Sequence, residues 1–401
     1  MAPTSARATP QRGERYAELD GHRGIAALAI VVFHIYQFSN INHFLYFGTL
    51  GYTLLNSLDA MVPWFFVITA FLLFKPIARL AIAGEGPVSA RGFLSRRAIR
   101  ILPAYYVAVA VVWFLRQDRL PGDWRDLLEH LTFTQVFDEK RIFYTIGPAW
   151  SLSVEVYFYL LLAVLAIGLG HLCRRLTSRK KRVAILAASV GVLGAAALLW
   201  KAWSFSIGER PTTGSYTTWF GPIANLDGFA IGMAVAVAAG ALGETRPLGP
   251  RTRSALRLAA LTLLIVAFAT RQPDAWSGPY FSTLCSVGFG CLIAAAVLGA
   301  PRGRRRRVLT VRPIRWLGQI SYSLYLWHEP VLLTLLGLGL IRQLPGSFLP
   351  NVAVVVAVSV VVGWLSYSLI ERPTSQLGQI FRRDTRLVRS PAALHIHSAG
   401  Q

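Results

Sequence analysis

Apolar residues along this chain gather into ten long runs, which short polar and mostly basic segments separate. The runs cover about residues 24–39, 58–80, 101–116, 149–170, 183–203, 219–241, 255–270, 279–300, 314–341 and 351–371. A helix needs about 20 predominantly apolar residues to cross a bilayer, and most of the runs approach or exceed that length. The pattern therefore predicts an all-α, polytopic membrane helix bundle of about ten transmembrane helices.

Two of the ten runs differ from a simple spanning helix. Run 255–270 is short, so it is expected to extend further or to lie partly in the membrane interface. Run 314–341 is long and carries Gly318, His328 and Pro330. We expect a break or kink in it, as in membrane helices that line a cavity.

The composition agrees with a membrane protein. Of 401 residues, 54% are hydrophobic and 15% are charged, and the mean hydropathy is +0.47. The 41 Lys and Arg residues against 19 Asp and Glu give a net charge of +22, which in a soluble protein would suggest nucleic acid. Here the basic segments alternate with membrane-length apolar runs, so membrane topology explains them and no nucleic-acid partner is expected.

The distribution of basic residues predicts the orientation of the bundle. With the N-terminus inside, six stretches are cytoplasmic and hold 32 of the 41 Lys and Arg residues. These stretches are 1–23, 75–100, 171–182, 243–257, 301–315 and 372–401. An odd number of spans would mix the two sides, so the asymmetry favours an even number with both termini inside, N-in and C-in.

The transmembrane domain is expected to cover residues 19–380, with cytoplasmic tails on either side. Residues 1–18 form the N-terminal tail, and 381–401 form a disordered C-terminal tail that is basic and contains Pro and Ser. The first apolar run lacks a small-residue cleavage site, so we expect a retained helix. The external region 118–147 contains an amphipathic segment at 123–131, which is expected to lie on the outer surface.

Ionisable residues inside the apolar runs point to a functional site, because they are costly in lipid. Arg23 opens the first run and His34 follows eleven positions later, about 16 Å along a helix. Glu155 is expected about 8 Å below the outer end of its run, and His328 about 21 Å from the inner end at Ile314. These depths overlap for His34, Glu155 and His328, so the topology predicts a shared polar cavity.

Such a set of residues suits general base catalysis. Histidine has an ordinary pKa near 6.5, so it can take a proton from a hydroxyl while a neighbouring carboxylate orients it. Glu155 is expected in the orienting role, and its acting as the base is left open. The alternative is that His34 or His328 only forms an interhelical hydrogen bond, worth about 1 kcal/mol. No Gly-x-Ser-x-Gly motif is present, which favours direct transfer over a serine acyl-enzyme.

Five motifs occur in order along the chain. They are residues 19–27 leading to His34, 63–72, 97–103, 150–155 and 320–328. Together they resemble the acyltransferase-3 family of integral membrane acyltransferases, over about residues 16–380. One departure is Thr69-Ala70, where the family usually has Ser-Gly. Another is the lack of the extra-cytoplasmic esterase-like domain that some members carry after the helices.

The resemblance implies transfer of an acyl group from cytoplasmic acyl-CoA to a hydroxyl acceptor. By carry-over, His34 is the catalytic residue and Glu155 orients or activates it. Arg23 lies on the donor side or positions a substrate, and Arg97 and Arg100 are candidates for the CoA phosphates. Basic residues there also fit the positive-inside rule alone. The other candidate substrate-binding residues are Trp150, Ser151, Tyr157, Tyr325 and His328, although the aromatic ones are also typical of packing.

The expected function is that of a membrane O-acyltransferase in a bacterial plasma membrane, acting on a carbohydrate or glycosylated acceptor with an acyl, expected acetyl, group. Acyl-CoA is a co-substrate, and neither a bound cofactor nor a metal is expected. The other partner is the lipid bilayer, and a homo-oligomer is left open. The alternative functions are a proton-coupled secondary transporter or lipid flippase, or a regulatory protein with a dead site. CoA is expected to enter from the cytoplasmic side, whereas Glu155 is expected nearer the outside. Either the pantetheine arm of CoA reaches deep into the bundle, or the acyl group crosses the membrane during catalysis.

Overall fold

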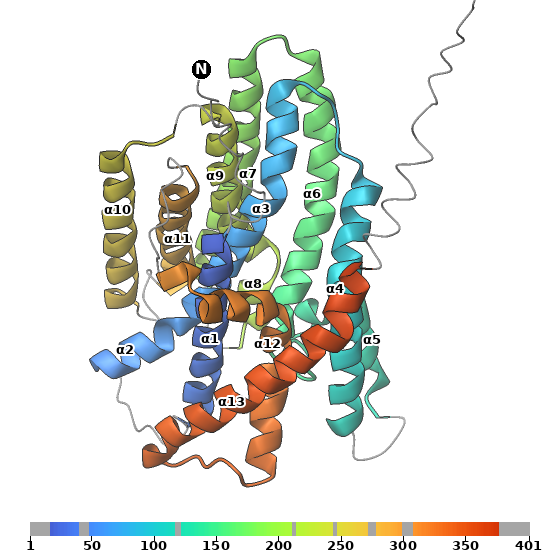
Figure 1. The fold of residues 1–401 in the computed structure, drawn as a ribbon, viewed down its shortest axis with the longest axis vertical. Helices are drawn as coiled ribbons and strands as arrows, with labels where there is room; N and C mark the ends of the chain where they lie inside the picture. Colours follow the sequence, from blue (N-terminus) through green and yellow to red (C-terminus); the bar gives the residue numbers. More distant parts are fainter. Residues whose placement is uncertain are drawn as a thin grey trace, which may run out of the picture.

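The computed structural model of this chain describes residues 17–39, 48–116, 122–210, 214–243, 247–271, 278–298 and 308–376. Within these ranges the regular structure is helical and includes ten helices of 17 or more residues (Figure 1). The predicted all-α polytopic bundle is confirmed. The proposed tails, up to residue 16 and from 377 onward, lie outside the described residues, as does the basic run at 304–307.

Each of the ten apolar runs corresponds to one long helix. These are α1 (Ala17–Ser39), α3 (Met61–Ala83), α4 (Ala90–Arg116), α6 (Ala149–Arg175), α7 (Arg179–Ser206), α9 (Leu226–Leu242), α10 (Pro250–Ala269), α11 (Phe281–Val297), α12 (Arg312–Gly337) and α13 (Phe348–Ser366). Three shorter α-helices are α2 (Leu50–Asn56), α5 (Trp124–Thr132) and α8 (Tyr216–Phe220). Eight helical segments of the described chain are long and apolar enough to span a membrane. Helices α1 and α12 are not among them, because polar and ionisable residues interrupt their apolar stretches. The count of ten spans and the N-in, C-in orientation stay predictions.

The predictions for the two unusual runs, 255–270 and 314–341, differ in how they compare with the structure. Helix α10 extends the short run toward its N-terminus and begins at Pro250, a favourable first-turn position for proline. Of the expected break or kink in run 314–341, the break is wrong, because α12 is continuous through Pro330, and a kink stays a prediction. The hydroxyl of Thr334 donates a hydrogen bond of 2.8 Å to the Pro330 carbonyl. The carbonyl that Pro330 leaves without its usual backbone donor is that of Leu326, and membrane helices tolerate such a freed group where their surroundings satisfy it.

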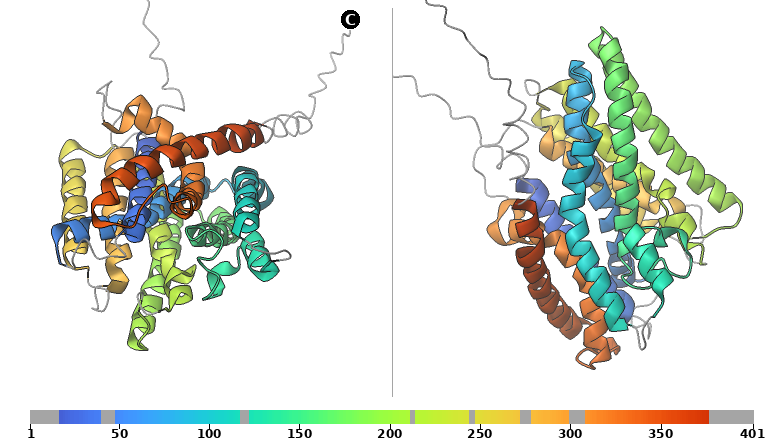
Figure 2. Two further views of the ribbon diagram at one scale, coloured as in Figure 1. Left: turned by 90° about the horizontal axis from the view of Figure 1, so that it is seen from below. Right: turned by 90° about the vertical axis from the view of Figure 1, so that its right-hand side faces the viewer.

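Helices that are distant in sequence pack closely at glycines. A Cβ atom added to Gly318 of α12 would lie 1.9 Å from the Asp20 carbonyl oxygen of α1, and one added to Gly24 would lie 2.5 Å from the Ile314 oxygen. In the same way, a Cβ on Gly232 of α9 would lie 2.2 Å from the Val67 oxygen of α3. Only glycine permits such backbone contacts. The contacts align α1 parallel to α12 and α3 parallel to α9, as alternating spans require, and α13 covers one side of α1 and α12 (Figure 2).

The segment between α4 and α6, which was predicted to be external, folds as a compact layer around α5. The predicted amphipathic helix is present, and its faces are reversed relative to a soluble protein. Asp126 and His130 are fully buried, whereas Trp124 and Leu128 are exposed. Thr145 donates a hydrogen bond to Asp126 from the loop before α6. An outward apolar face suits a helix that lies in the membrane interface.

Arg141 ties this layer together. Its guanidinium contacts Asp123 at 3.2 Å and Asp138 at 3.0 Å. Slight desolvation raises the pKa of Asp138, but hydrogen bonds from the Lys140 amide and from Arg141 outweigh it and hold this pKa below its usual value. The ionised form of Asp138 therefore stabilises the loop above its ordinary pKa, and this contribution is lost as pH falls through the lowered value.

A buried ion pair joins α7, α9 and α11. Lys201 and Asp227 are 2% and 4% exposed, and their charged atoms are 2.5 Å apart. The Lys201 ammonium also donates to the hydroxyls of Ser282 at 3.0 Å and Thr283 at 2.9 Å. Every proton of the ammonium thus has an acceptor. Lys201 and Asp227 lie outside the five motifs.

Replacing Lys201 by Met is expected to destabilise the protein strongly, because it leaves the Asp227 carboxylate buried without a cation. Breaking one side of a buried pair costs about 3–5 kcal/mol, whereas replacing both partners is often close to neutral. Thermal unfolding in detergent should show a large loss for Lys201→Met and a partial recovery for Lys201→Met with Asp227→Asn. Lys181→Met, at an exposed position on the same helix, is the control. Equal melting temperatures for Lys201→Met and the control would contradict the assignment.

Candidate functional site

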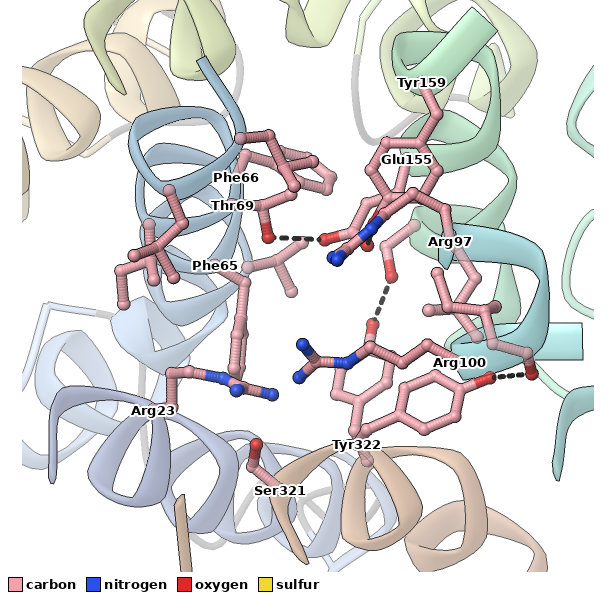
Figure 3. A pocket seen from close by; sticks show the side chains of 18 residues that line it. Arg23, Phe65, Phe66, Thr69, Arg97, Arg100, Glu155, Tyr159, Ser321 and Tyr322 are labelled. Carbon is pink, nitrogen blue, oxygen red and sulfur yellow. Dashed lines mark hydrogen bonds between the residues drawn. The ribbon is translucent and has the colours of Figure 1, made fainter. Parts of the chain in front are cut away.

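A cavity of about 100 Å³ lies among α1, α3, α4, α6 and α12 (Figure 3). Part of its lining is apolar and includes Phe65 and Phe66 of α3. The rest is charged and polar. Its charged members are Arg23 of α1, Arg97 and Arg100 of α4, and Glu155 of α6, and its uncharged polar members are Thr69, Ser151, Tyr159, Ser321, Tyr322 and Tyr325.

The charged lining carries more positive than negative charge. The side chains of Arg23 and Arg100 point toward one another across the cavity, and Arg97 lies nearer Glu155 (Figure 3). Guanidinium groups that face one another repel in a low-dielectric interior, so an anion placed between them is favoured. The cavity is therefore suited to a negatively charged ligand.

Glu155 is held by two hydroxyl groups. Its Oε1 accepts a hydrogen bond of 3.0 Å from Thr69, and its Oε2 accepts one of 2.5 Å from Tyr159, one helical turn further along α6. Thr69 stands where the family usually has serine, and its hydroxyl is retained as a donor. The neighbouring Ala70 is the point where α9 approaches closely, through Gly232.

Two histidines form a separate contact between α1 and α12. Nδ1 of His34 and Nε2 of His328 are 3.1 Å apart. Nδ1 of His34 is also 3.0 Å from the Ile30 carbonyl oxygen, and Nδ1 of His328 is 2.6 Å from that of Tyr325. His328 is 1% exposed, whereas His34 is partly exposed.

The structure therefore divides the predicted set of three ionisable groups. His34 contacts His328, whereas Glu155 bonds to Thr69 and Tyr159, so the hydrogen bond expected between Glu155 and His34 is not formed in this structure. The reason is the position of α1, which begins well short of the end that α3, α6 and α7 reach (Figure 1). Arg23 consequently lies inside the bundle at the level of Glu155, and His34 lies about 16 Å further along α1.

Tyr325 links the cavity to the histidine pair. Its hydroxyl oxygen is 2.7 Å from Oγ of Ser151 and donates to the Pro148 carbonyl at 3.0 Å. Its ring lines the cavity, and the ring centre is 5.6 Å from that of His328. Tyr325 therefore lies between the cavity and the histidine pair and contacts both.

The remaining predicted residues fall outside the cavity lining. Trp150 packs edge-on against Phe66 and Phe220, and so supports a cavity wall from behind. Tyr157 packs against Phe137 on the outer side of α6. Both fit the alternative that the sequence analysis left open, in which these aromatic residues serve packing.

Sequence reasoning missed several polar residues of the site. Tyr159 follows Glu155 by one helical turn, a spacing that could have identified it. Tyr322 lines the cavity and donates a hydrogen bond of 2.8 Å to the Ile101 carbonyl. Glu371 is buried in the π-helical turn Tyr367–Glu371 and accepts a hydrogen bond from Ser323. A π-turn rotates the following side chains relative to an α-helix, which the hydrophobic period does not reveal.

Comparison with known proteins identifies the family of the chain. A family model described as an acyltransferase domain matches residues 16–369. The chain is 29% identical to "Putative membrane-bound transacylase BcsY" of Komagataeibacter xylinus, over 89% of this chain and 82% of that protein. It is 26% identical to "Putative peptidoglycan O-acetyltransferase YrhL" of Bacillus subtilis (strain 168), over 92% and 56%. It is 24% identical to "Peptidoglycan O-acetyltransferase OatA" of Listeria monocytogenes, over 90% and 56%. No solved structure matches this chain.

The chain thus spans most of BcsY, but little more than half the length of YrhL and OatA. The family match contains the cavity, the histidine pair and all five motifs. Together with its apolar helices, the match shows a multi-pass membrane enzyme that transfers acyl groups, and the chain belongs to the acyltransferase-3 family.

Proposed function

We propose that this protein is a membrane O-acyltransferase that moves an acyl group, expected to be acetyl, from acyl-CoA to a hydroxyl of a carbohydrate or glycosylated acceptor. The observation that carries the proposal is a cavity lined by three arginines and connected through Tyr325 to a histidine pair. O-acetyl transfer by YrhL and OatA, as their names state, supports the choice of reaction. The proposed location is a bacterial plasma membrane.

The arginines are assigned to the donor. Arg97 and Arg100 are three residues apart on α4, so they share a face of the helix, and Arg23 approaches from α1. The planar guanidinium group binds phosphate oxygens through two parallel hydrogen bonds, which a compact ammonium group cannot do. The phosphates of CoA would offset the excess positive charge of the cavity lining.

His34 is assigned as the general base. It would remove the proton of the acceptor hydroxyl as the hydroxyl oxygen attacks the thioester carbonyl carbon. A C–O bond forms, the C–S bond breaks, and the proton on the imidazolium passes to the departing CoA sulfur. Atoms and charge balance without a metal or a covalent enzyme intermediate.

The separation of the two sites favours a donor that reaches deep into the bundle. Arg23 and His34 lie on one helix, about 16 Å apart along its axis. A CoA molecule held at the arginines would extend its arm past Tyr325, so the thioester arrives at His34 directly. Glu155, at the arginine end, would then shape the donor site by holding Thr69 and Tyr159 and by offsetting part of the positive charge.

The test is release of free CoA by purified protein in nanodiscs, supplied with acetyl-CoA or longer acyl-CoAs and a panel of glycosides. Acceptor-dependent release with matching acylation of the glycoside is the expected result. No release with any donor from well-folded protein would overturn the proposal. Movement of a solute or lipid across the membrane of proteoliposomes that contain the protein, without thioester cleavage, would favour the transporter or flippase.

Arg97→Gln and Arg100→Gln are expected to raise the KM for acyl-CoA by about 10- to 100-fold each, because a charge-assisted hydrogen bond contributes about 1.5–3 kcal/mol. The KM for the acceptor should change little. Arg91→Gln, exposed on the same helix and outside the cavity lining, is the matched control. An unchanged donor KM in both cavity variants would remove the arginines from the donor site.

A further inference from the structure

We infer that His328 is a positioning residue that fixes the tautomer of His34 and leaves Nε2 of His34 as the atom that receives the acceptor's proton. The inference rests on the proposed function, and it replaces Glu155 in the orienting role. It follows from which of the ring nitrogens must carry hydrogen.

The protonation of His328 is set by a backbone carbonyl. Its Nδ1 lies 2.6 Å from the Tyr325 carbonyl oxygen. A carbonyl oxygen can only accept, so Nδ1 of His328 must carry the hydrogen. In a neutral imidazole the other nitrogen is then bare, and Nε2 of His328 is an acceptor.

The protonation of His34 follows from that of His328. Nδ1 of His34 faces two acceptors, Nε2 of His328 at 3.1 Å and the Ile30 carbonyl oxygen at 3.0 Å. If Nδ1 were bare, three lone pairs would face one another without a hydrogen. Nδ1 of His34 must therefore donate, and Nε2 of His34 is left as the bare nitrogen.

The bare nitrogen is available for chemistry. Nε2 of His34 has no hydrogen-bond partner in the described part of the chain, and the residue is partly exposed. When Nε2 takes a proton, the positive charge spreads to Nδ1, where His328 and the Ile30 carbonyl accept its hydrogen. A carboxylate serves this purpose in many hydrolases, and here an uncharged imidazole serves it within the membrane.

The geometry also explains why the arrangement persists. Tyr325 fixes His328 through its carbonyl, and the tyrosine is itself anchored to Ser151 and to Pro148. The close approach at Gly24 and Gly318 keeps α1 and α12 in register. Both histidines are therefore held on helices whose spacing is fixed by backbone contact.

Kinetics of two variants test the role of His328. His328→Phe keeps a planar ring but removes the nitrogen that accepts the hydrogen bond from His34. It should lower kcat by about 10- to 100-fold, the range seen when metal-binding histidines lose the group that orients them. The KM for acyl-CoA should stay the same, because the arginines are unaffected. His328→Gln offers its side-chain oxygen to Nδ1 of His34 and should recover much of the loss. Equal loss in both variants, or a kcat for His328→Phe like that of the native protein, would overturn the inference.

A spectroscopic measurement on the native protein tests the tautomer without relying on activity. With ¹⁵N-labelled histidine in nanodiscs, the signal of His34, assigned by its loss in His34→Asn, should show a protonated Nδ1 and a bare Nε2. His328→Phe should show a mixture of tautomers. A protonated Nε2 in the native protein overturns this inference while acyl transfer stands. A native protein that releases no CoA overturns the proposed function itself.

Discussion

His34→Ala is expected to lower kcat for acyl transfer by about 10²- to 10⁴-fold, the usual contribution of a general base. The expected loss is in kcat, because His34 is not part of the cavity lining where the donor's charge would bind. The KM for acyl-CoA should therefore remain near the native value. Initial rates of CoA release over a range of donor concentrations measure both quantities.

The matched control is His171→Ala, at an exposed position near the end of α6. It should leave both constants unchanged, and thermal unfolding should confirm that each variant is folded. Near-native turnover by His34→Ala would dismiss His34 as the base and return Glu155 to that role. A higher donor KM with native kcat would place His34 in binding instead.

Gly318→Ala is expected to lower the free energy of unfolding of the bundle strongly for a substitution that adds a single methyl group. The added methyl would lie 1.9 Å from the Asp20 carbonyl oxygen and 2.6 Å from its carbon, and both are backbone atoms that no rotamer change can move. Helices α1 and α12 would have to separate. Overpacking of this kind costs about 1–3 kcal/mol and occasionally more. Because the same contact sets the distance between His34 and His328, kcat should also fall.

Gly337→Ala on the same helix provides the control, since a methyl there meets no atom of the described structure within 4 Å. Thermal unfolding in one detergent should separate the two variants clearly, with Gly337→Ala equal to the native protein. A Gly318→Ala protein with native melting temperature and native kcat would show that α1 and α12 are not held by this contact.

The sequence was sufficient to locate the long helices, because the thickness of the lipid bilayer sets the length of every membrane-spanning helix. The ten apolar runs located the ten long helices, since residues that face lipid or other helices must be apolar over most of that length. A break at Pro330 was expected because proline removes a backbone hydrogen bond and commonly ends helices in water, whereas α12 continues through it. The π-turn at Tyr367–Glu371 has no hydrophobic period that would distinguish it from an α-helix.

The site was predictable as a set of residues but not as a set of contacts. Six of the candidate residues line one cavity, namely Arg23, Arg97, Arg100, Ser151, Glu155 and Tyr325. His34 and His328, which were expected to share a cavity with Glu155, are not part of its lining. Counting residues along a helix gives depth only when the start of that helix is known, and α1 begins deeper than assumed. Depth also says nothing about direction around the helix axis. Both errors paired His34 with Glu155, when its partner is His328.

The pairing of α1 with α12 has a consequence for the synthesis of this protein. His34 and His328 are 294 residues apart in the chain, so the first helix is made long before its partner. At about 5–20 residues per second, α1 waits about 15–60 s in the membrane with the narrow glycine face at Gly24 uncovered. The three arginines of the proposed donor site are therefore synthesised before His34, the proposed base, acquires His328 as its neighbour. Until α12 inserts, the cavity lacks the wall that Ser321, Tyr322 and Tyr325 form, and His34 lacks His328, so on the proposed function neither donor binding nor acyl transfer can begin before α12 is in place.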